Sequence, residues 1–181
     1  MRNKVRHILL ITTLVFLISS NASAWDLNLA DKPLPYLAPK SVFNIQGAPI
    51  SLKKYRGKKV MLWLFSTWCH TCIVAAKSLE KHNAQLQKNG LTVLAIRNYK
   101  NGGNPGLNIE QFMGKFTPSL LKENNWVLGE ATAQLDKRYN AKHYADVYFL
   151  IDEQGMIQVV STSPAATLST IKQFLKGKSH E

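Results

Sequence analysis

Residues 60–72 read Val-Met-Leu-Trp-Leu-Phe-Ser-Thr-Trp-Cys-His-Thr-Cys, an apolar run followed directly by a pair of cysteines. Behind this stretch, apolar and small residues recur at helical spacing as far as Asn89, with Gly90 as a stop signal. The pattern predicts a strand that ends just before a helix, with Cys69 at the helix N-terminus and Cys72 one turn further in. A dithiol in this position is typical of a redox-active Cys-x-x-Cys motif.

The N-terminus of the predicted helix gives the two cysteines different roles. Unpaired backbone N–H groups and the positive end of the helix dipole stabilise an anion there, so we expect Cys69 to be the exposed, attacking thiolate. Cys72 is then the resolving thiol, which attacks Cys69 in a mixed disulfide with a partner protein. The Cys69–Cys72 disulfide is the only redox group that this chemistry needs, so we expect no further cofactor.

Neighbours of the cysteines are candidate tuning and docking residues. His70, as an imidazolium, would favour the thiolate of Cys69, and the competing interpretation is a solvated side chain without an electronic role. We expect Trp68 to pack over the dithiol and to shape the surface that partner proteins meet. Thr71, between the cysteines, is a candidate for the same surface.

Three other uses of a cysteine pair fit the sequence less well. A structural zinc site needs about four ligands, and the chain offers two cysteines and five histidines. An inert structural disulfide would stabilise little, because so short a loop removes little entropy from the unfolded chain. Attachment of c-type haem requires Cys-x-x-Cys-His, and Ile73 stands where the histidine belongs.

The first 24 residues have the pattern of a secretory signal peptide. Arg2, Lys4 and Arg6 precede an apolar stretch over residues 8–18, and residues 22–24 read Ala-Ser-Ala. We expect cleavage after Ala24 and export to the bacterial periplasm, an oxidising compartment. The alternative is an uncleaved N-terminal anchor, although the apolar stretch is shorter than the ~20 residues of a spanning helix.

The chain is strongly basic. Its formal net charge is +12, and loss of a signal peptide with three basic and no acidic residues leaves +9. Nucleic acid is not an expected partner of an exported domain. We interpret the charge as a source of solubility, of weak attraction to an anionic membrane surface, or of steering towards acidic partners.

Beyond the signal peptide, the chain predicts an extended, proline-rich leader over residues 25–40 and one α/β domain over residues 41–177. Strands flanking the first predicted helix should pair in parallel through a right-handed crossover. The predicted elements are a hairpin of residues 41–45 and 49–52, a strand at 59–65, a helix ending near 89, a strand at 91–96, a loop at 101–106, a helix at 109–115, a helix-compatible segment at 130–139, a hairpin of residues 147–151 and 156–161, and a helix at 167–175.

Three blocks carry a family resemblance: residues 47–58 (Gly-Ala-Pro-Ile-Ser-Leu-Lys-Lys-Tyr-Arg-Gly-Lys), 65–69 (Phe-Ser-Thr-Trp-Cys) and 149–157 (Phe-Leu-Ile-Asp-Glu-Gln-Gly-Met-Ile). Together they resemble the exported thioredoxins of the TlpA/ResA/CcmG type. The resemblance implies the thioredoxin fold, a central mixed sheet flanked by helices, with an N-terminal β-hairpin extension. It also implies a reductase of selected proteins, such as apocytochrome c during cytochrome c maturation or a metal-centre assembly protein, with electrons from a membrane donor.

The chain departs from the family pattern beside the dithiol. Family members carry a cis-proline before the Phe-Leu-Ile-Asp strand, and this place falls on Asp146, so we expect a trans bond and a rearranged loop. Asp146 either faces the sulfurs, opposing ionisation of Cys69 or accepting the proton of Cys72, or lies in solvent. The buried acid that many thioredoxins place beneath the dithiol corresponds to Trp63, so proton transfer needs water, His70 or Asp146.

The leading hypothesis is a periplasmic thiol:disulfide oxidoreductase that acts on protein thiols and disulfides, with the direction of electron flow undetermined. A thioredoxin-like metal-binding or chaperone module is the alternative. It would bind copper or another soft ion through Cys69 and Cys72, with His70 or His143 completing the ligand set. A redox-inactive binding domain is a third possibility, and the intact cysteine pair argues against it.

Overall fold

The structure is a computed structural model that describes residues 32–177, so the predicted signal peptide and the start of the leader lie outside the described residues. No helix in this part of the chain is long and apolar enough to cross a membrane. The elements are, in order, β1 (Tyr36–Leu37), β2 (Val42–Ile45), β3 (Ala48–Ser51), η2 (Leu52–Tyr55), β4 (Lys59–Phe65), α1 (His70–Lys88), β5 (Leu91–Arg97), η3 (Tyr99–Gly103), α2 (Ile109–Phe116), η4 (Pro118–Lys122), β6 (Trp126–Ala131), α3 (Ala133–Tyr139), β7 (Asp146–Ile151), β8 (Met156–Ser161) and α4 (Leu168–Leu175).

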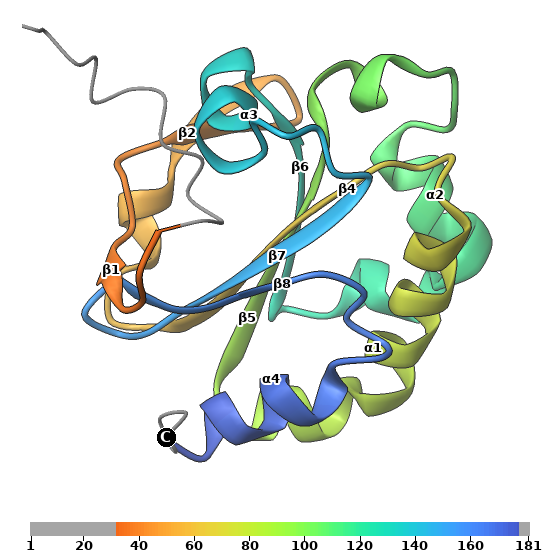
Figure 1. Ribbon diagram of the computed structural model, residues 1–181. Helices are drawn as coiled ribbons and strands as arrows, with labels where there is room; N and C mark the ends of the chain where they lie inside the picture. The colour runs from red at the N-terminus through yellow and green to blue at the C-terminus, as the bar shows by residue number, and fades with distance from the viewer. Residues whose placement is uncertain (1–31, 178–181) are drawn as a thin grey trace, which may run out of the picture.

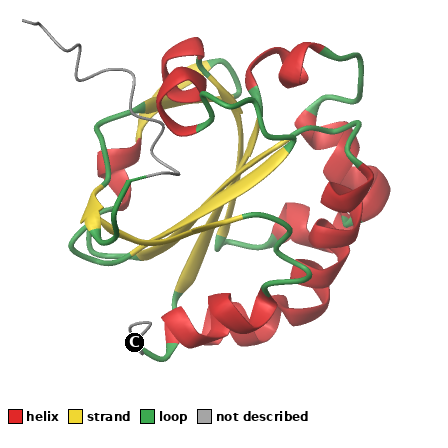
Figure 2. Ribbon diagram, viewed as in Figure 1, coloured by secondary structure: helices red, strands yellow, loops and turns green. Residues whose placement is uncertain are grey.

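The strands form one mixed sheet in the order β1-β8-β7-β4-β5-β6-β2-β3, which makes the central layer of the molecule (Figures 1 and 2). β4 is parallel to β5 and antiparallel to β7, so β4, α1 and β5 form the predicted βαβ unit. The hairpin of β2 and β3 extends the sheet because β2 pairs with β6. The thioredoxin fold with an N-terminal hairpin is therefore confirmed.

Alternating side chains of β4 reach two cores, one on each face of the sheet. Met61, Trp63 and Phe65 pack with residues of α1, α2 and α4. The intervening β4 side chains pack with residues of β2 and α3. Figure 1 shows α1 and α4 on one side of the sheet and α3 on the other. The dithiol at the start of α1 therefore lies on the Trp63 side.

β6 was not predicted, and the expected helix over residues 130–139 is wrong in its first residues. The chain forms a strand over Trp126–Ala131 and begins α3 only at Ala133. Gly129 has a packing role in this strand, because an added Cβ would lie 2.6 Å from the backbone oxygen of Asn44 on β2. The glycine and glutamate of this strand suit contacts with the neighbouring strands. They interrupt the alternation of apolar residues from which a strand is predicted.

Candidate functional site

The dithiol lies at the junction of β4 and α1 (Figure 1). Cys69 is the N-cap residue of α1, with an extended backbone (φ −78°, ψ 119°). The backbone N–H of Cys69 donates to the carbonyl of Ser66 at 3.1 Å, and that of Cys72 donates to the carbonyl of Cys69 at 3.2 Å. These bonds shape the first turn, and the predicted placement of both cysteines at the start of the helix is confirmed.

The two sulfurs have different surroundings. Cys69 keeps 6% of its surface exposed and Cys72 keeps none, and both are free thiols. Cys69 is less exposed than the sequence suggested, because it packs into the core on the Trp63 side. The Cys72 thiol donates to the carbonyl of Ala145 at 3.4 Å.

Cys72 is held in its protonated form. Burial raises the pKa of the Cys72 thiol, and the neighbouring Cys69 and the charge of Asp146 raise it further. A base must therefore take this proton before Cys72 attacks a disulfide. That requirement suits a thiol that acts second.

The other residues of the motif contact or flank Cys69. The Thr71 hydroxyl oxygen lies 3.0 Å from the Cys69 sulfur, so it donates to the sulfur when Cys69 is a thiolate. His70 is exposed on the first turn of α1. Trp68 is 48% exposed, and its indole N–H donates to the carbonyl of Asn101 at 2.8 Å. Trp68 thus presents a fixed aromatic surface beside the dithiol.

Asp146 is buried at the start of β7, which excludes the interpretation that places it in solvent. One carboxylate oxygen accepts from the indole N–H of Trp63 at 2.7 Å, and the other accepts from the backbone N–H of Ser163 at 3.2 Å. Burial raises the pKa of Asp146, and these two donors oppose the rise. The carboxyl group therefore lies close enough to Cys72 for its charge to act on that thiol.

The loop before Asp146 has the trans backbone that its sequence predicts. Leu34-Pro35 is the single cis bond within residues 32–177, so the bond before Asp146 is trans. Trp63 occupies the strand position where the family resemblance places a buried acid, and it donates its indole hydrogen bond to Asp146. The buried acid whose charge acts on Cys72 thus comes from β7 instead of β4.

A left-handed turn after β5 supports the segment before Cys69. Lys100, Asn101 and Gly102 have φ values of 48°, 57° and 67°. The side-chain oxygen of Asn101 accepts from the backbone N–H of Thr67 at 2.8 Å, in addition to the bond between its carbonyl and Trp68. The sequence predicted only a loop here, although Asn-Gly-Gly is a run that tolerates positive φ. Asn101 is therefore a positioning residue that sequence reasoning missed.

The structure does not assemble the ligand set of the copper alternative. His143 lies 3.6 Å from the carboxylate of Asp136, with which it pairs when protonated. Within residues 32–177, no group of three or more histidine, cysteine or acidic side chains is placed to hold one ion. The proposal that His70 or His143 joins Cys69 and Cys72 around a metal is therefore unsupported.

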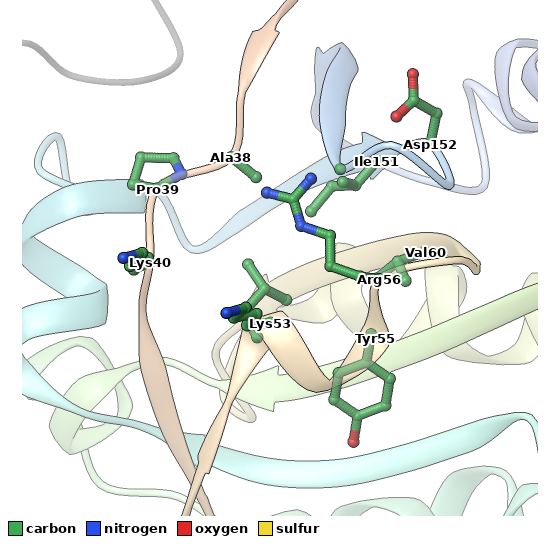
Figure 3. A pocket seen from close by; sticks show the side chains of 11 residues that line it. Ala38, Pro39, Lys40, Lys53, Tyr55, Arg56, Val60, Ile151 and Asp152 are labelled. Carbon is green, nitrogen blue, oxygen red and sulfur yellow. The ribbon is translucent and has the colours of Figure 1, made fainter.

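A separate cavity of about 190 Å³ lies at the opposite end of the sheet from the dithiol. Val60 and Ile151, which line it, pair at the end of β4 remote from Phe65. Figure 3 shows the Arg56 side chain extending towards Ile151, with Lys40 and Lys53 to its left. Asp152 also lines the cavity, so its wall carries three basic side chains and one acidic side chain and is basic on balance.

A thioredoxin-like sheet with one cysteine capping a helix and a second buried one turn later defines the class of thiol-disulfide oxidoreductases. Residues 31–175 match the model of the Redoxin family. The chain belongs to the Redoxin family, and it is an enzyme of the thiol-disulfide oxidoreductase class.

Relatives and solved structures agree with this assignment. The chain is 30% identical over 143 residues to thiol-disulfide oxidoreductase ResA of Geobacillus thermodenitrificans, with 77% of this chain and 74% of the relative covered. It is 28% identical over 122 residues to ResA of Geobacillus kaustophilus, covering 66% and 63% of the two chains. A thiol:disulfide interchange protein DsbE from Chlorobium tepidum matches with a TM-score of 0.61 and 19% identity, covering 78% and 95%. The last match shows a shared fold.

Proposed function

We propose that this protein is an exported reductase that keeps cysteines of selected partner proteins in the thiol state. The observation that carries the proposal is the asymmetry of the dithiol, with Cys69 capping the helix and Cys72 fully buried one turn later. This arrangement suits a nucleophile and a resolving thiol that act in sequence.

The reaction begins when the Cys69 thiolate attacks one sulfur of a partner disulfide. The partner's S–S bond breaks, a mixed disulfide forms, and the released partner sulfur takes a proton. Cys72 then loses its proton and attacks the Cys69 sulfur, which releases the second partner thiol. The protein is left with a Cys69–Cys72 disulfide, and the partner has gained two electrons and two protons.

Asp146 is the proposed acceptor of the Cys72 proton. Its carboxylate is buried, is oriented by the Trp63 indole, and raises the pKa of Cys72 through its charge. A carboxylate beside the dithiol also disfavours an anionic reduced form. Because stabilisation of the reduced form makes a dithiol couple more oxidising, its destabilisation supports a reducing role.

The cellular setting of the proposal comes from the N-terminal sequence and the family resemblance. The signal-like residues 1–24 support export to the periplasm, where a donor in the membrane would return electrons to the oxidised dithiol. The resemblance of residues 47–58, 65–69 and 149–157 to the TlpA/ResA/CcmG type supports a partner such as apocytochrome c or a metal-centre assembly protein.

Equilibration of the purified protein with glutathione tests both the activity and its direction. We expect a reduction potential near the about −270 mV of thioredoxin, and rapid transfer of electrons from the reduced protein to a disulfide-bonded peptide. Cys69→Ser should abolish the transfer. A potential near the about −120 mV of a strong oxidant would reverse the assigned direction. Equal transfer by the protein and by Cys69→Ser would exclude the dithiol mechanism.

A further inference from the structure

Two buried asparagines beside the dithiol have no part in the reaction described above. Asn98 follows β5 and is 1% exposed, and Asn140 is the C-cap residue of α3 and is 2% exposed. The two side chains contact each other, because the amide nitrogen of Asn140 donates to the side-chain oxygen of Asn98 at 3.2 Å.

Both asparagines bind the loop that faces the sulfurs. The Asn140 side chain accepts from the backbone N–H of Tyr144 at 2.7 Å and donates to the Tyr144 carbonyl at 2.8 Å. The Asn98 amide donates to the same carbonyl at 3.1 Å and to the Ser66 hydroxyl at 2.9 Å. One pair of side chains therefore joins the loop before β7 to the segment after β4.

The loop ends on the carbonyl that Cys72 uses. The Ala145 carbonyl accepts from the backbone N–H of Ser66 at 2.9 Å and from the Cys72 thiol at 3.4 Å. His143, three residues before Asp146, has a left-handed φ of 54°. This irregular stretch has few backbone bonds, so side chains supply further bonds that fix it.

Asparagine suits this position for a chemical reason. Its amide donates and accepts at once, as a peptide group does, whereas alanine leaves buried backbone groups without partners and aspartate cannot donate. The two side chains thus act as a substitute for backbone pairing.

We propose that Asn98 and Asn140 form a clamp that positions the Ala145 carbonyl against the Cys72 thiol and so favours the reduced state of the dithiol. Only the reduced state has a Cys72 proton to donate, so a fixed carbonyl stabilises that state over the disulfide. This contribution raises the reduction potential and therefore acts against the effect of the Asp146 charge. The inference rests on the proposed function only in requiring that Cys69 and Cys72 cycle between thiols and a disulfide. Asn98 and Asn140 are positioning residues.

The test compares Asn98→Ala and Asn140→Ala with a matched control, Asn83→Ala. Asn83 is also buried, and its side-chain oxygen accepts from Asn125 at 3.0 Å and from the Trp126 indole at 2.8 Å. Trp126 is the first residue of β6 and pairs with Val93. Val93 lies near Leu91, the first residue of β5, at the end of the sheet remote from the dithiol. The control therefore removes a comparable buried amide from the other end of the sheet.

The measured reaction is reduction of the protein disulfide by two glutathione molecules. One S–S bond breaks in the protein, one forms in glutathione disulfide, and the two protons pass to the protein sulfurs. We expect the equilibrium constant to fall by about threefold or more in both clamp variants, the size of one modest hydrogen bond. Amide hydrogen exchange at Tyr144 should also accelerate in both, and neither quantity should change in Asn83→Ala.

The outcomes separate the clamp from the proposed function. If the clamp variants and Asn83→Ala give the same equilibrium constant as the unchanged protein, the clamp is overturned while the redox function stands. If the unchanged protein does not react with glutathione, the proposed function fails first. Should one clamp variant fail to fold, the other decides, because each alone removes bonds to Tyr144.

Discussion

Burial raises the pKa of the Cys72 thiol most, and the charge of Asp146 adds to this effect. Asp146 raises the pKa of Cys72 and is itself buried, with Trp63 and Ser163 donating to its two oxygens. The Asp146 carboxylate opposes ionisation of the Cys72 thiol and can accept its proton when Cys72 attacks.

Asp146→Asn tests this role through the rate of resolution. We expect release of the second partner thiol to slow by about 100-fold or more, because the base is lost. The pKa of Asp146 lies above the ordinary carboxyl value of 3.8. The rate in the unchanged protein should therefore rise with pH across a window above that value, as the base loses its proton. In Asp146→Asn this rise should vanish, and an unchanged pH profile would contradict the assignment.

Thr71→Val tests the hydroxyl beside Cys69. The substitution keeps the side-chain shape and removes the oxygen that lies 3.0 Å from the sulfur. We expect alkylation of Cys69 at neutral pH to slow by about three- to tenfold, because a hydrogen bond to the thiolate is lost. Thr92→Val, at the end of β5 remote from the dithiol, is the control and should leave the rate unchanged.

At the scale of elements, the sequence predicts helices and strands best where their buried residues recur regularly. α1 was predicted from the spacing of its buried residues, and β4 from its apolar run, since both contact the core along one continuous pattern. β6 was not predicted, because its residue types depend on contacts with neighbouring strands and not on a regular apolar pattern. Gly129 illustrates this dependence, with Asn44 on β2 leaving no room for a side chain.

Gly129→Ala should destabilise the protein. The added Cβ would lie 2.6 Å from a backbone oxygen of β2, and overpacking of this kind costs about 1–3 kcal/mol. Urea denaturation measures the free energy of unfolding. The control is Gly114→Ala on α2, where the nearest atom lies 3.7 Å from the new Cβ, and alanine should stabilise the helix by about 0.5–1 kcal/mol. Equal effects in the two variants would contradict the close approach of β2.

Across the whole molecule, the sequence located the dithiol and the fold but not the surroundings of the sulfurs. Cys69 and Cys72 were predictable because the Cys-x-x-Cys motif directly follows one apolar strand and lies at the start of one helix. Asn98, Asn101 and Asn140 were not, because each contacts the site from a distant part of the chain. The choice between a buried and a solvated Asp146 also depended on the neighbouring strand β4, whose Trp63 donates to the carboxylate.

The basic cavity far from the dithiol predicts weak contact with anionic membranes through that end of the molecule. Lys53→Gln with Arg56→Gln should reduce the affinity for phosphatidylglycerol vesicles, measured by sedimentation, by about 30-fold at low salt, since each basic group near such a surface contributes about 1 kcal/mol. Lys115→Gln with Lys122→Gln removes the same charge from α2 and η4 and should have less effect. Equal losses would mean that net charge alone drives binding.

The order in which the two cysteines act is tested most directly by trapping the mixed disulfide. Reduced Cys72→Ser and Cys69→Ser proteins are mixed with a disulfide-bonded peptide at neutral pH, and the products are identified by mass spectrometry. The account predicts a stable adduct on Cys69 in Cys72→Ser and none in Cys69→Ser, because Cys72 is buried and protonated. An adduct that forms as fast on Cys72 in the Cys69→Ser protein would contradict it.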